Sequence, residues 1–266
     1  MNLKEKKARL EKILAGYDTL IVAFSGGVDS TLLLAVAGKV LNKRVVAVTF
    51  ASPFQPRREI QTAIDMAKTL DVTHSVLRTE TIDPRELIAN TRDRCYVCKK
   101  QLGEKLLAIA RKLNIGTIAH GANLDDLDDF RPGFKAAQEI GMAAPLIDAG
   151  FTKTDVRALS KEMGLDTWDK PAMACLATRI PYDTPITLEA LDKIDRAETV
   201  ILEAGFSTCR VRYHGNCARI ELLPAELERM LDKSCRESIA GMLRDIGFLY
   251  VAIDLEGYSQ GKMNRA

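Results

Sequence analysis

The chain has 266 residues, which is room for one large domain or two modest ones at about 150 residues per domain. With 47% apolar residues, 28% charged residues, 17 glycines and 9 prolines, the composition excludes a collagen-like, low-complexity or largely disordered protein. Its 38 basic and 36 acidic residues leave a formal net charge of +2, which argues against a protein that wraps nucleic acid or lies on a membrane surface.

The hydropathy and the first residues predict a cytoplasmic protein. No unbroken apolar run approaches the roughly 18 residues that a membrane span requires. The N-terminus mixes Glu5 with several positive charges and leads into an amphipathic helix, unlike the apolar core of a secretion signal. In that compartment the six cysteines are expected to be thiols, ligands or nucleophiles and not a disulfide framework.

A repeating pattern organises residues 19 to 165, where apolar runs of strand length alternate with amphipathic runs of helix length. This alternation is typical of a parallel sheet with crossover helices, and strands that are apolar on both faces indicate a buried sheet. We therefore expect an α/β fold with a doubly wound parallel sheet. Strands are expected at 19–24, 44–50, 74–79, 117–120 and 143–147, and helices at 30–41, 56–70, 84–90, 99–113 and 153–163.

The pattern breaks between residues 166 and 187, where three prolines prevent a long helix. Beyond this break, expected helices at 188–204 and 225–246 and expected strands at 209–213, 218–222 and 248–255 form a smaller α+β unit. We divide the chain into a parallel-sheet domain at 1–166, a linker at 167–186 and a C-terminal domain at 187–266 that serves substrate binding or oligomerisation.

The loop after the first expected strand has the composition of a phosphate-binding turn. It consists of Ser25, Gly26, Gly27, Val28, Asp29 and Ser30. Adjacent glycines let the backbone approach an anion closely, and the helix N-terminus that follows presents free N–H groups and a positive dipole end. An ordinary strand-to-helix turn with a Ser or Asp cap is the alternative. Neither a Walker A string nor a dinucleotide-binding G-x-G-x-x-G occurs in the chain.

Ser-Gly-Gly-x-Asp-Ser after a first strand resembles the signature of the PP-loop ATP pyrophosphatases. The resemblance implies that residues 25–30 hold the pyrophosphate portion of ATP, which is cleaved between its α and β phosphates. A second match contains Gly121, Asn123 and Asp125 at the end of the fourth expected strand, where an open α/β sheet places its ligands. The four carboxylates at positions 125, 126, 128 and 129 fit Mg²⁺ as well as they fit a solvated acidic turn.

Three further segments, 129–133, 170–181 and 257–264, narrow the resemblance. Together, over essentially the whole chain, they resemble the LarE family of sulfur transferases. The resemblance implies an ATP-dependent enzyme that sulfurates a pyridinium biscarboxylate mononucleotide on the way to the nickel-pincer cofactor of lactate racemase. It also implies a homo-oligomer, with a hexamer as one form, and a small-molecule substrate with no nucleic acid or membrane partner.

Cys175 is the candidate nucleophile. Adenylation turns a carboxylate into an acyl electrophile, and a thiolate is the strongest side-chain nucleophile near neutral pH. Arg179 lies nearby in sequence and would lower the pKa of the thiol if the geometry allows. The resemblance implies a sacrificial reaction, in which the cysteine forms a thioester and then loses its sulfur by β-elimination to become dehydroalanine. A buried structural cysteine is the alternative.

Cys95 and Cys98 form a C-x-x-C that the sacrificial reaction does not require. With Cys175 they suit three-point ligation of a [4Fe-4S] cluster, because thiolates are its ligands and a fourth iron stays open to bind an extra sulfide. Such a cluster would make sulfur transfer catalytic. Zinc would need a fourth protein ligand. A pair of free thiols, or two cysteines that only pack in the core, would give the same spacing.

Arg210 and Arg212 alternate along an expected strand and therefore point to one face. The guanidinium fork suits phosphate or carboxylate, although a solvated basic strand face gives the same pattern. The resemblance favours a clamp for the phosphate of a mononucleotide. We include Arg179 and Glu198 among the predicted substrate-binding residues.

Three rival functions remain open. A PP-loop ligase of the NAD or GMP synthetase type would pass ammonia to the adenylate, but it gives Cys175 no role. A PP-loop tRNA thiolase is closer in chemistry, yet the balanced charge argues against binding a polyanion. A nucleotide-sensing or iron-sulfur binding module without turnover would bind ATP and release no pyrophosphate.

Overall fold

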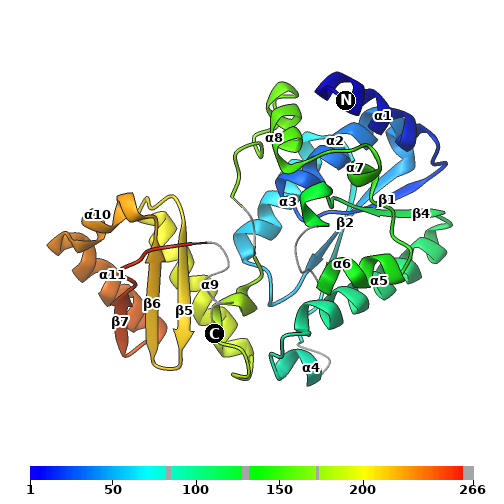
Figure 1. Cartoon of the computed structure of the whole chain (residues 1–266). Coiled ribbons are helices and arrows are strands. Elements are labelled where there is room, and N and C mark those ends of the chain that lie inside the picture. The colour runs from blue at the N-terminus through cyan, green and yellow to red at the C-terminus, as the bar shows by residue number, and fades with distance from the viewer. Residues whose placement is uncertain (82–84, 128–131, 172–173, 260–266) are drawn as a thin grey trace. The chain divides into compact units, whose positions relative to one another are not determined.

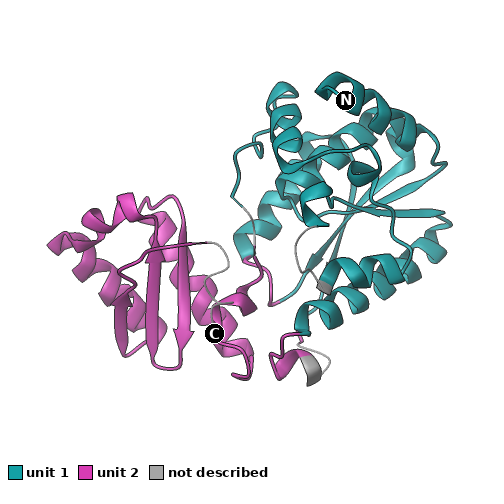
Figure 2. Ribbon diagram, in the orientation of Figure 1, with its two compact units in different colours: residues 1–52, 57–79, 93–173 teal, residues 53–56, 80–92, 174–266 magenta. Residues whose placement is uncertain are grey.

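A computed structural model describes residues 1–81, 85–127, 132–171 and 174–259 (Figure 1). These residues form two compact units, coloured separately in Figure 2. Unit 1 contains residues 1–52, 57–79 and 93–173, and unit 2 contains residues 53–56, 80–92 and 174–266.

Unit 1 is built on a four-stranded parallel sheet with the strand order β3-β2-β1-β4. The strands are β1 (Leu20–Ala23), β2 (Val45–Ala51), β3 (Thr73–Arg78) and β4 (Thr117–His120). The helices are α1 (Leu3–Ala15), α2 (Val28–Leu41), α3 (Arg57–Thr69), α5 (Arg94–Leu113), α6 (Pro132–Glu139), α7 (Pro145–Asp148) and α8 (Lys153–Glu162), with the 3-10 turns η1 (Asn42–Arg44) and η2 (Leu124–Asp126).

Helices cover both faces of this sheet, as expected for a doubly wound fold (Figure 1). Leu20 and Val22 of β1 lie in one core with residues of α1, α2, α3, α7 and α8. Ile21, between them, lies in a second core with residues of β2, β4 and α5. Successive side chains of a strand point to opposite faces, so a strand buried on both faces must be apolar throughout. The expected α/β class is confirmed.

Three elements expected between residues 1 and 166 differ in the structure. The expected strand at 143–147 is wrong: Ala143 makes one isolated parallel bridge to Ala119, and α7 follows at once because Pro145 suits the first turn of a helix. The helix expected from residue 99 begins five residues earlier, at Arg94, so both cysteines of the C-x-x-C lie on α5. The helix expected at 84–90 is the single turn α4 (Arg85–Ile88).

Unit 2 contains a three-stranded sheet with the order β5-β6-β7. Its strands are β5 (Cys209–His214), β6 (Cys217–Leu222) and β7 (Tyr250–Ile253), and its other elements are α4, η3 (Leu176–Arg179), α9 (Leu188–Glu203), η4 (Pro224–Glu226), α10 (Leu227–Leu231) and α11 (Lys233–Ile246). The strands β5 and β6 form an antiparallel hairpin, and β7 pairs with β6 in parallel. Residues of α9, α11 and all three strands share one core.

The expected helix at 225–246 is interrupted in the structure. Asp232 separates α10 from α11, and its carboxylate accepts hydrogen bonds from the backbone N–H groups of Ser234 and Cys235. An acidic N-cap satisfies the free N–H groups of a new helix, so a helix starts there and the previous one stops. The strand expected at 248–255 is also shorter, because only the four residues of β7 are in strand register with β6.

The two units differ from the expected division of the chain in two ways. Unit 1 continues past residue 166 to residue 173, and unit 2 takes two short segments that follow β2 and β3. Hydrogen bonds within unit 2 hold these segments to the loop around Cys175. The backbone N–H of Leu176 donates to the carbonyl of Phe54 (2.7 Å), and the side chain of Asn90 donates to the carbonyl of Pro181 (2.7 Å).

None of the described helices combines the length and the apolar composition needed to cross a membrane.

Candidate nucleotide and sulfur-transfer sites

The loop at residues 25–30 joins β1 to α2 and has the geometry of an anion cradle. Gly26 adopts φ +71°, and a Cβ there would lie 3.1 Å from the backbone of Ala63 on α3, so only glycine fits. Ser25 and Ser30 close the loop through their hydroxyl groups, which lie 3.1 Å apart. Gly27 is the N-cap of α2 and provides no capping side chain, which leaves the positive end of the helix to the loop and its ligand.

The second predicted motif packs directly on this loop. A Cβ on Gly121 would lie 2.7 Å from the backbone nitrogen of Ser30, so glycine allows the end of β4 to touch the start of α2. Asn123 is fully buried, and its Nδ2 donates to Oδ1 of Asp29 (2.9 Å). The structure therefore brings together Asp29, Ser30, Gly121 and Asn123, which were predicted from two motifs far apart in the sequence.

Lys153 completes this group, although no sequence motif predicted it. Its Nζ lies 2.5 Å from Oδ2 of Asp29, and its backbone N–H donates to Oδ2 of Asp125 (2.9 Å). Lys153 is the first residue of α8, behind the N-cap Thr152. A cation at a helix N-terminus opposes the helix dipole, and this unfavourable position was the available signal of a functional lysine.

The acidic cluster predicted to bind Mg²⁺ is described in part. Asp126 is buried, and its Oδ2 accepts the backbone N–H of Asn123 (3.0 Å), while Asp125 accepts that of Lys153. Asp128 and Asp129 lie outside the described residues. Among the residues that the structure describes, no group of three or more His, Cys, Asp or Glu side chains is placed to hold a metal ion. Magnesium binding by this cluster stays a prediction.

A second lysine, also missed, contacts the loop through Gly26. Lys170 Nζ donates to the carbonyl of Gly26 (3.3 Å) and forms an ion pair with Oε2 of Glu59 (2.6 Å). Lys170 opens the segment 170–181 on which the family resemblance depends, and that position was the signal that it belongs to the site.

Cys95 and Cys98 lie in the first turns of α5, Cys95 exposed and Cys98 half-buried. Residues three apart on a helix share one face, so the pair suits two adjacent ligands of a metal or cluster. Cys175, the third predicted ligand, belongs to unit 2.

Cys175 is the half-buried N-cap of η3. Its carbonyl accepts Nη1 of Arg179 (3.1 Å), and the same Nη1 donates to the carbonyl of Ala174 (2.9 Å). Arg179 therefore shapes the backbone around the cysteine. Burial alone would lower the pKa of Arg179, but the Glu198 carboxylate outweighs it and raises that pKa above its usual value, so the guanidinium stays charged.

Glu198 holds Arg179 from α9. The pair makes two hydrogen bonds, Nε to Oε1 (2.8 Å) and Nη2 to Oε2 (3.0 Å), and neither side chain is accessible to solvent. Oε1 also accepts the backbone N–H of Val211 on β5 (3.1 Å). Glu198 thus links α9, η3 and β5, and these contacts give it a supporting position beneath Arg179. Substrate binding by either residue stays a prediction.

Arg210 and Arg212 lie on one face of β5, opposite Glu221 and Arg219 of β6. Both are buried, which argues against the alternative of a solvated basic strand. Arg212 binds Oε2 of Glu221 (2.6 Å), and Arg210 lies 5.0 Å from the ring centroid of Tyr258. Burial, followed by the charge of nearby Arg179, lowers the pKa of Arg210. An anionic ligand would relieve that repulsion.

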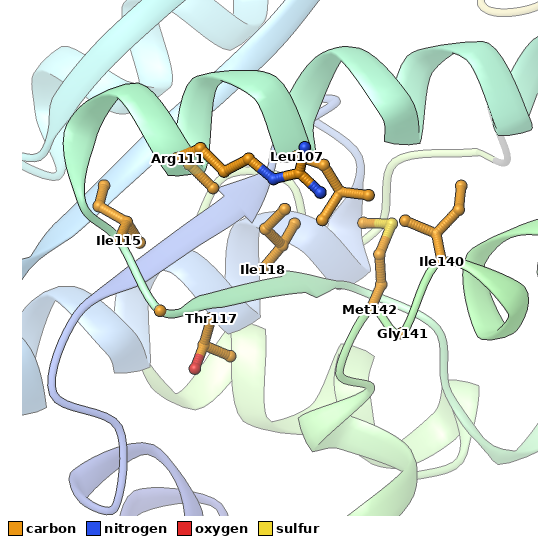
Figure 3. A pocket seen from close by; sticks show the side chains of 10 residues that line it. Leu107, Arg111, Ile115, Thr117, Ile118, Ile140, Gly141 and Met142 are labelled. Atoms are coloured by element: carbon orange, nitrogen blue, oxygen red, sulfur yellow. The ribbon is translucent and has the colours of Figure 1, made fainter.

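A separate pocket of about 330 Å³ opens at the other end of β4 (Figure 3). Leu107, Ile118, Ile140 and Met142 contribute to its apolar wall, and Arg111 is the one charged residue of the ten that line it. The pocket begins beside Thr117, whereas the PP-loop contact begins at Gly121 after the strand has ended. It is separate from the predicted nucleotide site.

Comparisons with known proteins agree with this geometry. Residues 19–110, which include the loop at 25–30 and the C-x-x-C, match the family described as queuosine biosynthesis protein QueC.

Three relatives match nearly the whole chain. An uncharacterized protein of Synechocystis, slr1717, is 38% identical over 99% of this chain and 98% of its own. Pyridinium-3,5-bisthiocarboxylic acid mononucleotide synthase of Lactiplantibacillus plantarum is 36% identical over 98% of this chain and 95% of its own. An uncharacterized protein of Methanocaldococcus jannaschii, MJ0830, is 30% identical over 97% of this chain and 94% of its own length. With its PP-loop, its parallel sheet and this full-length similarity, the chain belongs to the LarE family of PP-loop sulfur transferases.

Proposed function

We propose that this chain is a cytoplasmic, ATP-dependent sulfur transferase that acts on pyridinium-3,5-biscarboxylic acid mononucleotide. It adenylates a carboxylate of this small molecule and converts it to a thiocarboxylate, a step of nickel-pincer nucleotide biosynthesis. The observation that carries the proposal is the PP-loop joined to Asn123 and Lys153 through Asp29, in a chain 36% identical to the Lactiplantibacillus synthase.

The first step transfers AMP to the substrate. A carboxylate oxygen attacks the α phosphorus of ATP, and pyrophosphate leaves with the bonding electrons. The loop at residues 25–30 and the N-terminus of α2 hold the pyrophosphate, and Lys153 offsets the negative charge of Asp29 beside it. Mg²⁺, when bound, would neutralise phosphate charge, and the oxygen ligands that Asp125 offers are of the kind it prefers.

The second step replaces AMP with sulfur. The thiolate of Cys175 attacks the acyl carbon, a thioester forms, and AMP departs with the oxygen. Removal of the Cα proton of Cys175 then breaks its Cβ–Sγ bond. The sulfur stays on the product as a thiocarboxylate, and the residue becomes dehydroalanine. Each chain delivers one sulfur by this route.

Cys95 and Cys98 offer a route that spares Cys175. Two thiols on one face of α5, with a third from Cys175, would supply the three thiolate ligands of a [4Fe-4S] cluster. When bound, the cluster would supply an open iron site that carries the sulfide to be transferred. The chain would then turn over repeatedly with an intact Cys175.

The charged face of β5 is the proposed phosphate clamp for the mononucleotide. Arg210 donates to the carbonyl of Cys209, and Arg212 donates to the carbonyl of Thr178 and to the carboxylate of Glu221. These hydrogen bonds fix the position of both guanidinium groups. A fixed pair of guanidinium groups binds phosphate with little loss of side-chain entropy.

We also propose that the protein is a homo-oligomer, with a hexamer as one form. β7 is an edge strand of the sheet in unit 2, and Leu249, Tyr250 and Leu255 on or beside it are exposed. Unpaired strand edges with apolar residues favour association with another chain. Light scattering in solution tests this, and a monomeric mass would contradict it.

One experiment tests the chemistry. Freshly isolated anaerobic protein is analysed for iron, incubated with MgATP and the biscarboxylate mononucleotide, and examined for pyrophosphate, thiocarboxylate and intact mass. The sacrificial route predicts iron-free protein that becomes lighter by the mass of hydrogen sulfide. The cluster route predicts iron, an unchanged mass and more than one product per chain. The proposed function would be contradicted if no thiocarboxylate forms, whether or not the protein contains iron.

Two variants assign the steps. Asp29→Ala should abolish pyrophosphate release, whereas Asp18→Ala, which changes an almost fully exposed carboxylate, should not. Cys175→Ser should release pyrophosphate and make no thiocarboxylate, whereas Cys235→Ser, which changes another half-buried thiol, should retain the whole reaction. Normal thiocarboxylate formation by Cys175→Ser would contradict the assignment of the nucleophile.

A further inference from the structure

Lys170 places an ammonium group on the PP-loop from a segment that follows α8. Its Nζ contacts the carbonyl of Gly26 at 3.3 Å and Oε2 of Glu59 at 2.6 Å. The side chains of Lys170 and Glu59 are only 18% and 19% exposed, so both charges are largely removed from water. Desolvation offsets most of the attraction within such an ion pair, so it adds little to stability, which points to another use for these two charges.

Glu59 lies in the first turn of α3, one turn before the contact of that helix with the loop. Ala63 of α3 packs against Gly26, which also accepts the hydrogen bond from Lys170. The carboxylate therefore holds the ammonium group beside the backbone turn that receives phosphate.

The backbone of Lys170 is fixed independently of its side chain. Arg157 of α8 donates from Nη1 to the carbonyl of Trp168 and from Nη2 to the carbonyl of Lys170, both at 2.8 Å. The backbone N–H of Lys170 donates in turn to the carbonyl of Thr167 (3.1 Å). A guanidinium fork that binds two carbonyls of one segment fixes both its position and its direction.

α8 thus places two lysines at the PP-loop, one of its own and one in the segment that follows it. Lys153, at its N-terminus, lies against Asp29, and Lys170 is anchored one turn further along the helix through Arg157. Resting on the proposed function, we propose that Lys170 is a direct ligand of the pyrophosphate portion of ATP and that Arg157 is the residue that positions it. In the absence of nucleotide Glu59 retains the ammonium group, and the phosphates displace this carboxylate when ATP binds.

The charges of the site favour this exchange. Asp29 and Glu59 bring two carboxylates to a loop whose ligand is a polyanion. Asp29 is paired with Lys153, and Glu59 is paired with Lys170 through Oε2 and, at 3.8 Å, with the neighbouring Arg58 through Oε1, so Glu59 keeps a cation partner when Lys170 leaves it. Pyrophosphate carries more negative charge than a carboxylate and presents oxygens in several directions, so it competes effectively for an ammonium group that has three donors.

The first test measures binding of magnesium pyrophosphate and MgATP to the full-length protein by calorimetry. Lys170→Met should weaken both by about tenfold or more, the usual loss for a charge-assisted hydrogen bond, and should leave adenosine binding unchanged. Lys68→Met, which removes an exposed lysine from the last turn of α3, is the control and should bind both as the parent does. Equal binding by Lys170→Met would overturn the proposal.

A double variant distinguishes a ligand from a residue that only neutralises Glu59. If Lys170 contacts phosphate, Glu59→Gln should bind pyrophosphate at least as tightly as the parent protein, because the competing carboxylate is gone. The double variant Lys170→Met/Glu59→Gln should then bind pyrophosphate much more weakly than Glu59→Gln. If Lys170 only neutralises Glu59, the double variant recovers the parent affinity, which would overturn the proposal.

The positioning role of Arg157 is tested by comparing the effect of its substitution with and without the Lys170 side chain. Arg157→Gln should weaken pyrophosphate binding in the parent protein and have no further effect in the Lys170→Met background. A merely structural role would weaken binding equally in both backgrounds and would overturn the positioning role. If the parent protein binds no MgATP, the proposed function itself is contradicted. If the parent protein binds MgATP and Lys170→Met binds it equally well, only this inference is contradicted.

Discussion

Arg179 and Glu198 form a doubly hydrogen-bonded ion pair from which solvent is excluded, with 1% and 0% of their side chains exposed. The pair joins the turn that begins at Cys175 to α9, and through the N–H of Val211 it also reaches β5. The cysteine and the arginines of the proposed phosphate clamp therefore share one buried support.

Glu198→Gln should lower the free energy of unfolding by about 3–5 kcal/mol, because it leaves the Arg179 charge buried without its partner. Glu189→Gln, the same substitution on the same helix, changes an exposed carboxylate paired with Lys193 one turn away and should cost less than about 0.5 kcal/mol. Urea denaturation of both variants measures the difference. Similar losses for the two variants would contradict the role of the buried pair.

Gly121→Ala should abolish MgATP binding and lower the free energy of unfolding by about 1–3 kcal/mol. The new Cβ would lie 2.7 to 2.9 Å from the backbone of Asp29 and Ser30, and backbone atoms at a helix start do not move without moving the loop. Gly116→Ala, at the other end of β4, meets no atom within 4 Å and is the matched control. Calorimetry with MgATP tests both, and ATP binding by Gly121→Ala would show that the contact is dispensable.

Asn90→Asp should loosen the loop around Cys175 and leave ATP binding intact. Asn90 is fully buried at φ +56°, and its Nδ2 donates to the carbonyls of Pro181 (2.7 Å) and Thr184 (3.1 Å). A carboxylate of the same shape has no donor, so it would face these carbonyls with like charge.

Hydrogen exchange measures this loosening at two backbone amides. The amide of Leu176 donates a hydrogen bond to the carbonyl of Phe54, and the amide of Ile186 donates to the carbonyl of Ile88. Both should exchange about tenfold faster or more in Asn90→Asp, in proportion to the lost hydrogen bonds. Amides of the loop at residues 25–30 provide the internal reference and should keep their rates. A uniform increase over both units would instead indicate general destabilisation.

The sequence predicted the PP-loop well because its determinants are local. Two glycines and a helix start lie within six residues of one another, so the pattern is recognised in the sequence without knowledge of distant contacts. Lys153 and Lys170 could not be found in this way, since 124 and 144 residues separate them from their partners Asp29 and Gly26. Only the fold of α8 against α2 shows that both face one loop.

The errors in the predicted elements have a similar origin. The apolar run after Gly141 suits a strand, but β4 accepts one bridge from Ala143 before Pro145 starts a helix. The helical pattern from 225 to 246 is continuous in hydrophobicity, yet the capping carboxylate of Asp232 divides it. In both cases a local backbone preference outweighed the periodicity.

His120 ends β4 beside the nucleotide motif and should make stability depend on pH. Burial, together with the nearby Lys99 charge, lowers the pKa of His120 from 6.5 to about 4, against the opposing effect of Asp126. Among the described residues its buried Nε2 has no hydrogen-bond partner. The ring is therefore neutral in the folded protein at pH values where the unfolded chain already binds a proton.

Because the unfolded state binds more protons between pH 6.5 and about 4, the contribution of His120 is complete above pH 6.5 and is lost as the pH falls through about 4. The loss amounts to roughly 3 kcal/mol over that window. His120→Asn should flatten this part of the stability profile in urea denaturation at a series of pH values. A proton NMR titration of the parent ring gives an independent measure, and a pKa near 6.5 would contradict the prediction even if the variant does not fold.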